Sequence, residues 1–584
     1  MIRRPTLTVL LFLAAAASLA LSTSLVAQTR DPWAAIGGTR TLRPRPTRGE
    51  ISIADLQSRL YRFSADSMEG RILGSRGNVL GTDYIAGEVR RLGLEPAGEN
   101  GTYFQTLPMV DRSLDTTATL AVGGTAWRAW ADFVPRDQGP GTRAIDGVAV
   151  VYGGDFADTV SRITPDAARG KLVVLTFSGA IAGNPPGVPN RGAVNQRYPE
   201  AAGIAVVARD DMPADQVAGF QRPTTIILFD GPPALPTYLY ITQAMADALL
   251  GGPLGSARAG AEGRALRGNV MWHNVPSPFP ARNVVAILRG SDPTLQAEYV
   301  AVGAHNDHVG MGQPVAHDSI YVVNHRYRQQ GADDAPVGRL TDAQATEVNA
   351  ALAQIRRATN GVSARADSIY NGADDDGSGS MAVLEIAERM ATQRQRPKRS
   401  VLFVWHVGEE AGLFGSQWFT DHPTVPREAI IAQLNVDMIG RGAATDITGQ
   451  TLTGDKIHGG PDYLQVIGSR RTATQLGDLV EQVNREGRHG LVFDYSLDAN
   501  AHPQNIYCRS DHYMYARYGI PIAFFTTGGH ADYHQVTDEA QFIEWAHYLR
   551  VTKFIADLTM RTADLPQRPV VDHPLPDPRG RCQQ

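Results

Sequence analysis

The stretch VLFVWHVGEEAGLFGS, residues 401–416, decides the fold of this chain. Residues 401–405 are continuously apolar, which is typical of a parallel strand that is buried on both faces of a sheet. A turn with two adjacent acids, Glu409 and Glu410, follows directly. Because ligands bind beyond the carboxyl ends of strands in open α/β sheets, this order predicts an acidic site at such an end.

The surrounding sequence repeats the pattern of buried strand and polar turn. Segments with helical spacing of apolar residues stand between the apolar runs, the clearest at 380–390. This alternation predicts an α/β fold in which helices flank a mixed, mostly parallel sheet. The further apolar runs that we assign to the sheet are 283–288, 299–303, 432–436 and 520–525.

Metal-binding residue types stand where these segments meet. They are His305, Asp375, Glu410, Asp437 and His534. Two histidines and three carboxylates suffice for two zinc ions if one carboxylate bridges them, since a neutral imidazole cannot. The set contains no cysteine, which suits zinc and leaves manganese or cobalt as alternatives. We therefore expect a dimetal centre for hydrolysis.

Two more acids lie beside these ligands. Glu409 precedes Glu410 and is placed to take a proton from a water between the metals, as a general base does. Asp307 is two residues from His305, and we expect it to hold the second N–H of that imidazole. Each residue taken alone is ordinary for a loop or turn. The prediction therefore depends on all of them occurring together.

Composition bounds the class of protein. A chain of 584 residues exceeds one ordinary core, so we expect two or more domains. Its 43% hydrophobic and 20% charged residues indicate a folded soluble protein. A net charge of -5 without a basic run argues against a nucleic-acid partner.

The N-terminus has the order of a secretory signal. Arg3 and Arg4 precede an apolar run at 9–21, and a short polar stretch ends at Ala27. We expect cleavage near Ala27 and export to the periplasm or the cell exterior, with no membrane contact afterwards. An uncleaved anchor helix is the alternative, because the run approaches spanning length. The sequence leaves open whether the two cysteines, Cys508 and Cys582, form a disulfide.

Together these segments resemble the clan MH dizinc exopeptidases, a family of secreted bacterial aminopeptidases with glutamate carboxypeptidases and glutaminyl cyclases as relatives. The opening stretch MEGRILGSRG at 68–77 is similar to the N-terminal segment of that family. The piece EAAGIAVV at 200–207 is similar to the protease-associated domain often inserted there. The resemblance implies peptide substrates and removal of their N-terminal residues.

The resemblance also implies roles for the ligands. His305 and Asp437 would bind one zinc, Glu410 and His534 the other, and Asp375 would bridge them. We choose Asp375 over its neighbours because the middle acid of the run 374–376 has the family's spacing to the following glycine.

The comparison also implies two catalytic residues and leaves one competing pair of acids. Glu409 would be the general base and acid, and Tyr533 would donate a hydrogen bond to the oxyanion of the tetrahedral intermediate. The pair Asp333 and Asp334 competes for the bridging role. Pro336 follows that pair, whereas a Gly-Ser-Gly turn and a periodic helix follow the run at 374–376, so we prefer the latter.

The chain then divides as follows. We expect a peptidase domain built from two separate segments, with a β-rich, protease-associated-like domain between them. The predicted segments are 1–27 (signal), 28–50 (linker), 51–117 (first part of the peptidase domain), 118–270 (β-rich domain), 281–562 (catalytic domain, with an insertion at 309–370) and 563–584 (Pro-rich tail).

Three other functions fit the same fold. A carboxypeptidase would need an arginine for the terminal carboxylate, for which Arg441, Arg509 and Arg517 are candidates. A glutaminyl cyclase would need one zinc, and a non-catalytic binding protein would be expected to have lost ligands. The complete ligand set favours the aminopeptidase.

Overall fold

The computed structural model describes residues 41–584 except 118, 138, 140, 180–187, 229–233, 329–335, 444–448, 575, 576, 579 and 581. The expected signal at 1–27, the linker residues before 41, and the pair Asp333 and Asp334 lie outside the described residues. Within the described part, no helix combines the length and the apolar character needed to cross a membrane.

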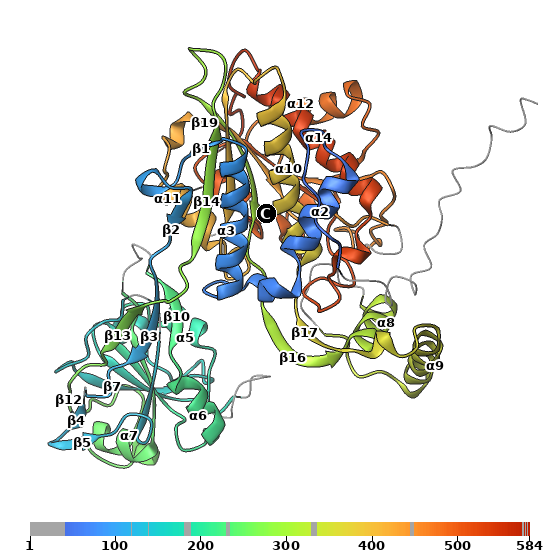
Figure 1. The fold of residues 1–584 in the computed structure, drawn as a ribbon. Coiled ribbons are helices and arrows are strands. Elements are labelled where there is room, and N and C mark those ends of the chain that lie inside the picture. The colour runs from blue at the N-terminus through green and yellow to red at the C-terminus, as the bar shows by residue number, and fades with distance from the viewer. Residues whose placement is uncertain are drawn as a thin grey trace, which may run out of the picture.

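A nine-stranded sheet forms the centre of the larger lobe (Figure 1). Strands β18, β15, β19 and β22 run parallel, whereas β14 and β20 are antiparallel to their neighbours in this group. The predicted mixed, mostly parallel sheet is therefore confirmed. The strand order is β1 (Glu95–Pro96), β14 (Arg282–Leu288), β18 (Ser400–His406), β15 (Tyr299–His305), β19 (Ile430–Val436), β22 (Ile522–Thr526), β20 (Tyr463–Ile467) and β21 (Val492–Asp494), with β2 (Phe104–Thr106) on β14.

Helices cover both faces of this sheet because its strands are apolar on both sides. In β15, Val300 and Val302 point into one core, and Tyr299 and Ala301 into the other. The first core includes α2 (Ile53–Phe63), α3 (Arg76–Arg91), α10 (Gly379–Thr392), α12 (Thr474–Glu486) and α14 (Trp545–Ala563). The second includes α11 (Phe414–Asp421) and α13 (His512–Ala516).

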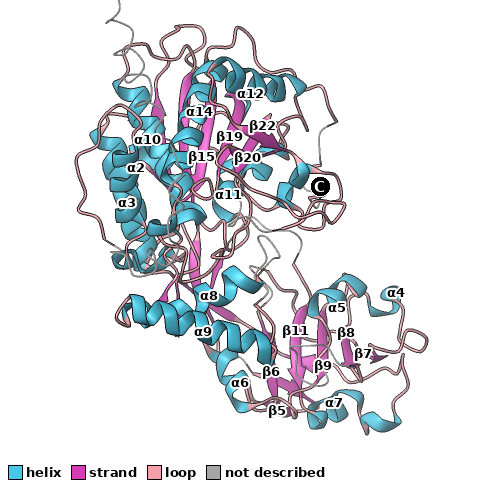
Figure 2. Ribbon diagram, turned by 90° about the vertical axis from the view of Figure 1, so that its right-hand side faces the viewer, coloured by secondary structure: helices cyan, strands magenta, loops and turns pink. Residues whose placement is uncertain are grey.

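The smaller lobe has its own sheet with helices on both faces (Figure 2). Strands β7, β8, β9 and β11 are parallel, and only β6 is antiparallel. We expected a β-rich module, and the lobe also contains helices. These helices are short, so their apolar periodicity is weak in the sequence. The elements are β6 (Phe133–Arg136), β7 (Val150–Asp155), β8 (Leu172–Thr176), β9 (Gly203–Val207), β11 (Thr237–Ile241), α4 (Pro165–Ala168), α5 (Arg191–Arg197), α6 (Ala214–Gln221) and α7 (Gln243–Leu250).

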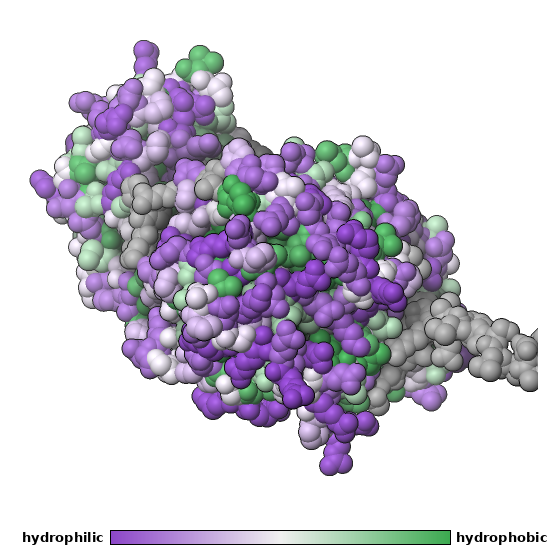
Figure 3. Space-filling model, turned by 90° about the horizontal axis from the view of Figure 1, so that it is seen from above, coloured by the Kyte–Doolittle hydropathy of each residue, from purple (hydrophilic) through white to green (hydrophobic). Residues whose placement is uncertain are grey.

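Paired strands carry the chain into and out of this lobe. β3 (Met109–Leu114) and β13 (Trp272–Pro276) are antiparallel partners, and β10 (Thr224–Ile227) pairs with the other edge of β3. A further small sheet joins β4 (Leu120–Val122), β5 (Thr125–Trp127) and β12 (Leu266–Arg267). The domain boundaries near 118 and 270 remain predictions. On the face of the molecule shown in Figure 3, apolar residues are scattered among hydrophilic ones.

The segment predicted as an insertion forms an arm beside the larger lobe (Figures 1 and 2). The antiparallel pair β16 (Met311–Ala316) and β17 (Ala366–Ile369) leads to α8 (His317–Tyr327) and α9 (Asp342–Ala358). Helix α9 begins after Thr341, whose side chain forms a capping box with Gln344. The arm packs its own apolar cluster against Phe542 of the larger lobe.

The C-terminal tail is tied to the larger lobe by a disulfide. Cys508 and Cys582 are bonded, with 5.8 Å between their Cα atoms. The side-chain amide of Gln584 donates to the carbonyl of Ala499 over 3.0 Å and accepts from the backbone N–H of Tyr507 over 2.9 Å. The pairing that the sequence left open is therefore present.

We expect reduction of this disulfide, or Cys582→Ser, to lower the free energy of unfolding by about 2–4 kcal/mol, because the bond closes a long loop in the unfolded chain. Urea unfolding with and without reductant measures the difference. Equal midpoints in both conditions would contradict a stabilising role.

Candidate metal centre

The predicted site residues gather at one edge of the large sheet. His305 is the last residue of β15, Asp437 follows β19, and Glu410 follows β18. His534 lies in the loop after β22. Because β18, β15, β19 and β22 are neighbouring parallel strands, their carboxyl ends meet at this edge. Asp375 joins them from the turn that leads into α10.

Asp375 lies between two histidines and offers one oxygen to each. Its Oδ1 is 3.1 Å from Nε2 of His305, and its Oδ2 is 3.1 Å from Nε2 of His534. This is the placement that a bridging carboxylate requires.

Two ligand groups flank this carboxylate. On one side, Nε2 of His305 is also 3.6 Å from Oδ1 of Asp437. On the other, Nε2 of His534 is 2.9 Å from Oε2 of Glu410. Zinc–ligand bonds of 2.0–2.1 Å in a tetrahedron place ligand atoms about 3.3 Å apart, and the observed separations lie around that value. The donor set therefore fits two divalent cations.

Two buried atoms of the first group support this fit. Nε2 of His305 and Oδ1 of Asp437 are buried, and neither makes a hydrogen bond of acceptable geometry among the described residues. Buried polar atoms are normally paired, so these two are placed as a cation would require. The second carboxylate oxygen of Asp437 accepts a hydrogen bond from Ser510 Oγ over 2.7 Å, which fixes the orientation of the carboxylate.

The neighbours of Asp375 in the acidic run point elsewhere. Asp376 accepts backbone hydrogen bonds from His305 over 3.0 Å, from Gly379 over 2.9 Å and from Met438 over 3.2 Å. It thereby joins the ends of two strands to the start of α10. Asp374 accepts from the backbone N–H of Gly440 over 2.6 Å.

Asp538 fixes the backbone of the acidic run from the far side. Its carboxylate accepts the backbone N–H groups of Asp374 and Asp375, each over 3.0 Å. Asp538 therefore holds the turn that carries the expected bridging carboxylate.

Asp307 contacts both the first ligand and the adjacent acid. Nδ1 of His305 is 3.2 Å from the backbone oxygen of Asp307 and 3.6 Å from its Oδ1. That same Oδ1 accepts the backbone N–H of Glu409 over 3.2 Å. The nearest acceptor for the imidazole is thus the carbonyl, and the carboxylate orients the turn that carries Glu409.

The two adjacent glutamates have opposite electrostatic environments. Burial, and then the charge of Asp437, raises the pKa of Glu409 well above its ordinary value. Despite burial and the charge of Asp375, the imidazole of His534 lowers the pKa of Glu410 to about 2. The two carboxyls thus differ in basicity, and Glu410 is the one held ionised, as a metal ligand must be.

A pocket opens beside the first ligand group. Its polar lining includes Asp375, Glu409, Asp437, Arg509 and Tyr533. The sequence did not reveal its apolar wall, because only Phe524 belongs to a predicted strand and the other wall residues come from segments without periodicity. The apolar wall consists of Met438, Leu497, Ile506 and Phe524.

Tyr533 faces this pocket in its protonated form. Burial raises the pKa of its hydroxyl. Nη2 of Arg509 donates to that hydroxyl over 3.2 Å, which leaves the phenolic proton directed elsewhere. The other two candidate arginines are engaged away from the pocket: Arg441 pairs with Asp532 and Arg517 with Asp421.

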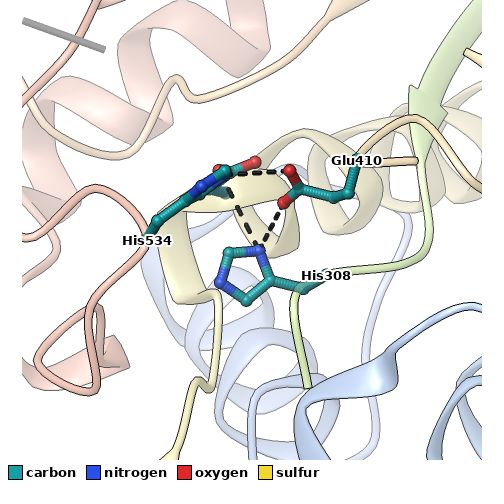
Figure 4. A group of neighbouring side chains, drawn as sticks. His308, Glu410 and His534 are labelled. Carbon is teal, nitrogen blue, oxygen red and sulfur yellow. Dashed lines mark hydrogen bonds and ion pairs between the residues drawn. The ribbon is translucent and has the colours of Figure 1, made fainter. Parts of the chain in front are cut away.

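His308 lies beside the predicted ligands, although it is not among the ligands predicted from the sequence. Its side chain is fully buried, and its Nδ1 is 2.7 Å from Oε1 of Glu410 (Figure 4). A lone histidine after the expected ligand carried no spacing signal that could have marked it.

A third histidine–carboxylate group lies at the base of the arm. It comprises His317, Asp367 and Glu539. Nη2 of Arg365 lies 3.1 Å from Asp367 and 2.6 Å from Glu539, so a guanidinium already supplies positive charge there. This group joins the arm to the loop after His534.

The arm also contacts the loop that carries Tyr533 and His534. Arg328, after α8, donates to the backbone oxygens of Ala531 and Tyr533. Nε2 of His325 lies 3.0 Å from Oδ2 of Asp532. The position of this loop therefore depends on an element far from it in sequence.

His512 packs behind the pocket, and we expect it to make the free energy of unfolding depend on pH. It stacks on Phe524 with 4.6 Å between ring centroids. Burial lowers its pKa from 6.5 to about 3, so the folded state binds fewer protons than the unfolded state between these values. Stability is then complete above pH 6.5 and falls below it.

The expected loss from this residue is about 1.5 kcal/mol between pH 6.5 and 5. We expect His512→Phe, which keeps the stack on Phe524, to remove that part of the loss. Urea unfolding of both proteins at the two pH values measures it. Parallel pH dependence in the two proteins would contradict the assignment.

Known proteins resemble parts of this chain. The sequence profile described as Peptidase family M28 matches residues 283–559. Leucine aminopeptidase 1 of Coccidioides posadasii (strain C735) is 32% identical over 158 residues, which are 26% of this chain and 36% of that protein. Leupeptin-inactivating enzyme 1 of Streptomyces exfoliatus is 29% identical over 178 residues, which are 30% of this chain and 33% of that protein.

The chain thus spans about a third of the length of these two curated relatives. Among solved structures, the aminopeptidase from Aneurinibacillus sp. strain AM-1 is similar over 89% of this chain and 96% of that one, with a TM-score of 0.42 and 15% identity.

Proposed function

We propose that this chain is an exported, dizinc aminopeptidase that removes N-terminal residues from peptides, since residues 283–559 match the profile described as Peptidase family M28. The observation that carries the proposal is the position of Asp375, whose two oxygens each lie 3.1 Å from a different histidine. The names of the relatives, among them leucine aminopeptidase 1, support the same reaction.

The chain's own residues divide the work of hydrolysis. Two zinc ions held by the five ligands would supply Lewis-acid activation of the scissile carbonyl and of a water. Glu409 takes the proton of the attacking water at its carboxylate and later delivers it to the leaving amine nitrogen. Tyr533 donates a hydrogen bond from its hydroxyl to the oxyanion that develops on the carbonyl.

The pocket favours an apolar side chain at the substrate's N-terminus. Leu497, Ile506 and Phe524 present apolar surface beside Glu409. Burial of a leucine or phenylalanine side chain there is favourable by about 1.5–3 kcal/mol. We therefore propose substrates with a bulky apolar first residue.

Glu409→Gln tests the proton transfer. We expect kcat for aminoacyl nitroanilides with a free amine to fall by about 10²–10⁴, because the amide cannot accept the proton. Zinc content should stay unchanged, since Glu409 is not among the ligands. The exposed Glu347→Gln on α9 is the matched control and should be fully active.

Removal of the metal by a chelator is the second part of this experiment. Activity should disappear with the metal and return with zinc. N-blocked substrates should remain uncleaved throughout. Cleavage of N-blocked substrates, or full activity of Glu409→Gln, would refute the proposed reaction.

Tyr533→Phe tests the oxyanion contact. We expect kcat to fall by about 10²–10³ with little change in KM, because this hydrogen bond strengthens only in the transition state. Tyr327→Phe on the arm should match the native enzyme. Steady-state kinetics on leucine nitroanilide separates the two parameters, and an unchanged kcat would exclude this role for Tyr533.

A carboxypeptidase is the second candidate, because Arg509 lines the pocket and could bind a terminal carboxylate. It would cleave peptides with a blocked N-terminus and a free C-terminus. The preference for an aminopeptidase follows from the hydrogen bond that already directs Arg509 towards Tyr533.

We propose export on two grounds. The segment at 1–27 has the order of a secretory signal. The disulfide between Cys508 and Cys582 suits the oxidising periplasm or cell exterior. We further propose that the smaller lobe is a protease-associated domain that limits access of large substrates.

A further inference from the structure

His308 is held rigidly against the second ligand group. Its ring rests on Gly372, where an added Cβ would lie 2.5 Å from the imidazole Cγ. Its ring also makes an edge contact with His534, with 5.5 Å between centroids. The same Cβ would lie 2.2 Å from the carbonyl oxygen of Asp375, so position 372 requires glycine both for the turn of the acidic run and for the close approach of the imidazole.

Nδ1 of this imidazole lies among the other ligand atoms. It is 2.7 Å from Oε1 of Glu410 and 3.9 Å from Oδ2 of Asp375. Nε2 of His534 approaches Glu410 at 2.9 Å (Figure 4) and Asp375 at 3.1 Å. One atom from each of the four residues lies within 4.8 Å of every other. These separations surround the value of about 3.3 Å that a tetrahedral zinc site gives.

The geometry points to His308 as a fourth protein ligand of the metal held by Asp375, Glu410 and His534. This inference rests on the proposed dimetal centre and gives its two metal sites different numbers of protein ligands. The second site then has two nitrogen and two oxygen ligands from the protein, which fill the four positions of a tetrahedral zinc ion.

The other site then keeps the open position. It has three protein ligands, His305, Asp375 and Asp437, as catalytic zinc sites do. The pocket is lined by Asp375, Asp437 and Glu409, whereas Glu410 and His308 do not line it. Substrate and the proton acceptor therefore meet at the three-ligand site. The four-ligand site holds its metal more tightly and fixes the shared carboxylate.

The competing interpretation is that His308 only donates Nδ1–H to Glu410. The variants His308→Ala and His308→Asn distinguish the two, because asparagine retains an N–H donor for Glu410. His502→Ala is the control, since His502 is also buried but hydrogen-bonds to the carbonyl of Gln450 over 3.0 Å and to the backbone N–H of Gln504 over 3.2 Å, neither of which belongs to the metal centre.

Competition with a chromophoric chelator measures the affinity of each protein for its two zinc ions. We expect the native protein to bind one zinc much more tightly than the other. Both His308 variants should lose affinity for the tighter zinc by about 100-fold or more, whereas His502→Ala should lose none. Thermal unfolding of the metal-free variants establishes that they fold.

X-ray absorption or a crystal structure of the native, zinc-loaded protein provides a readout that needs no variant. A distance of about 2.1 Å from Nδ1 of His308 to zinc supports the inference. A distance beyond hydrogen-bond contact, or native affinity in His308→Asn, overturns it while leaving the dimetal centre intact. Failure of the native protein to bind zinc would overturn both.

Discussion

The active edge of this molecule depends on one carboxylate shared between two histidines from distant parts of the chain. His305 ends β15, His534 follows β22, and Asp375 reaches both from the turn before α10. A shared ligand of this kind permits little error, because each oxygen must face its own partner. The surrounding hydrogen bonds show how the fold meets that demand. Asp376 and Asp538 accept backbone N–H groups on either side of Asp375 and hold its turn in place.

The sequence could predict the fold where the physical signal is local. A run such as 401–405 is apolar without interruption because it is buried on both faces, and this property is visible in one dimension. The five expected ligands were identifiable because each stands beside such a run or before a periodic helix. Their convergence then follows from the parallel order of β18, β15, β19 and β22.

The parts that the sequence did not predict depend on long-range contacts. His308 follows a strand by a few residues, and only folding brings it beside Glu410. Two residues of the apolar wall, Leu497 and Ile506, lie in irregular segments. The disulfide between Cys508 and Cys582 ties the tail of the chain to the second of these segments. The parallel sheet of the smaller lobe was missed because its helices are too short to show a helical period.

The arm shows why a long insertion can be tolerated beside such a site. Loop insertions cost little entropy when their ends are close, and β16 pairs with β17 to join the ends of this one. The arm also stabilises the loop of Tyr533 and His534, because Arg328 donates hydrogen bonds to two backbone oxygens of that loop. That loop carries one proposed metal ligand and the proposed oxyanion donor, so the contacts of the arm help to fix the position of both.

Buried negative charge links this architecture to metal binding. Asp375, Glu409, Glu410 and Asp437 lie within one small region, where like charges without compensation are costly. Burial already raises the pKa values of Glu409 and Asp437. Two divalent cations would offset the ligand charges, while the backbone donors around Asp375 fix geometry without neutralising it. Metal affinity and folding at this edge of the sheet are consequently coupled, because the same residues serve both.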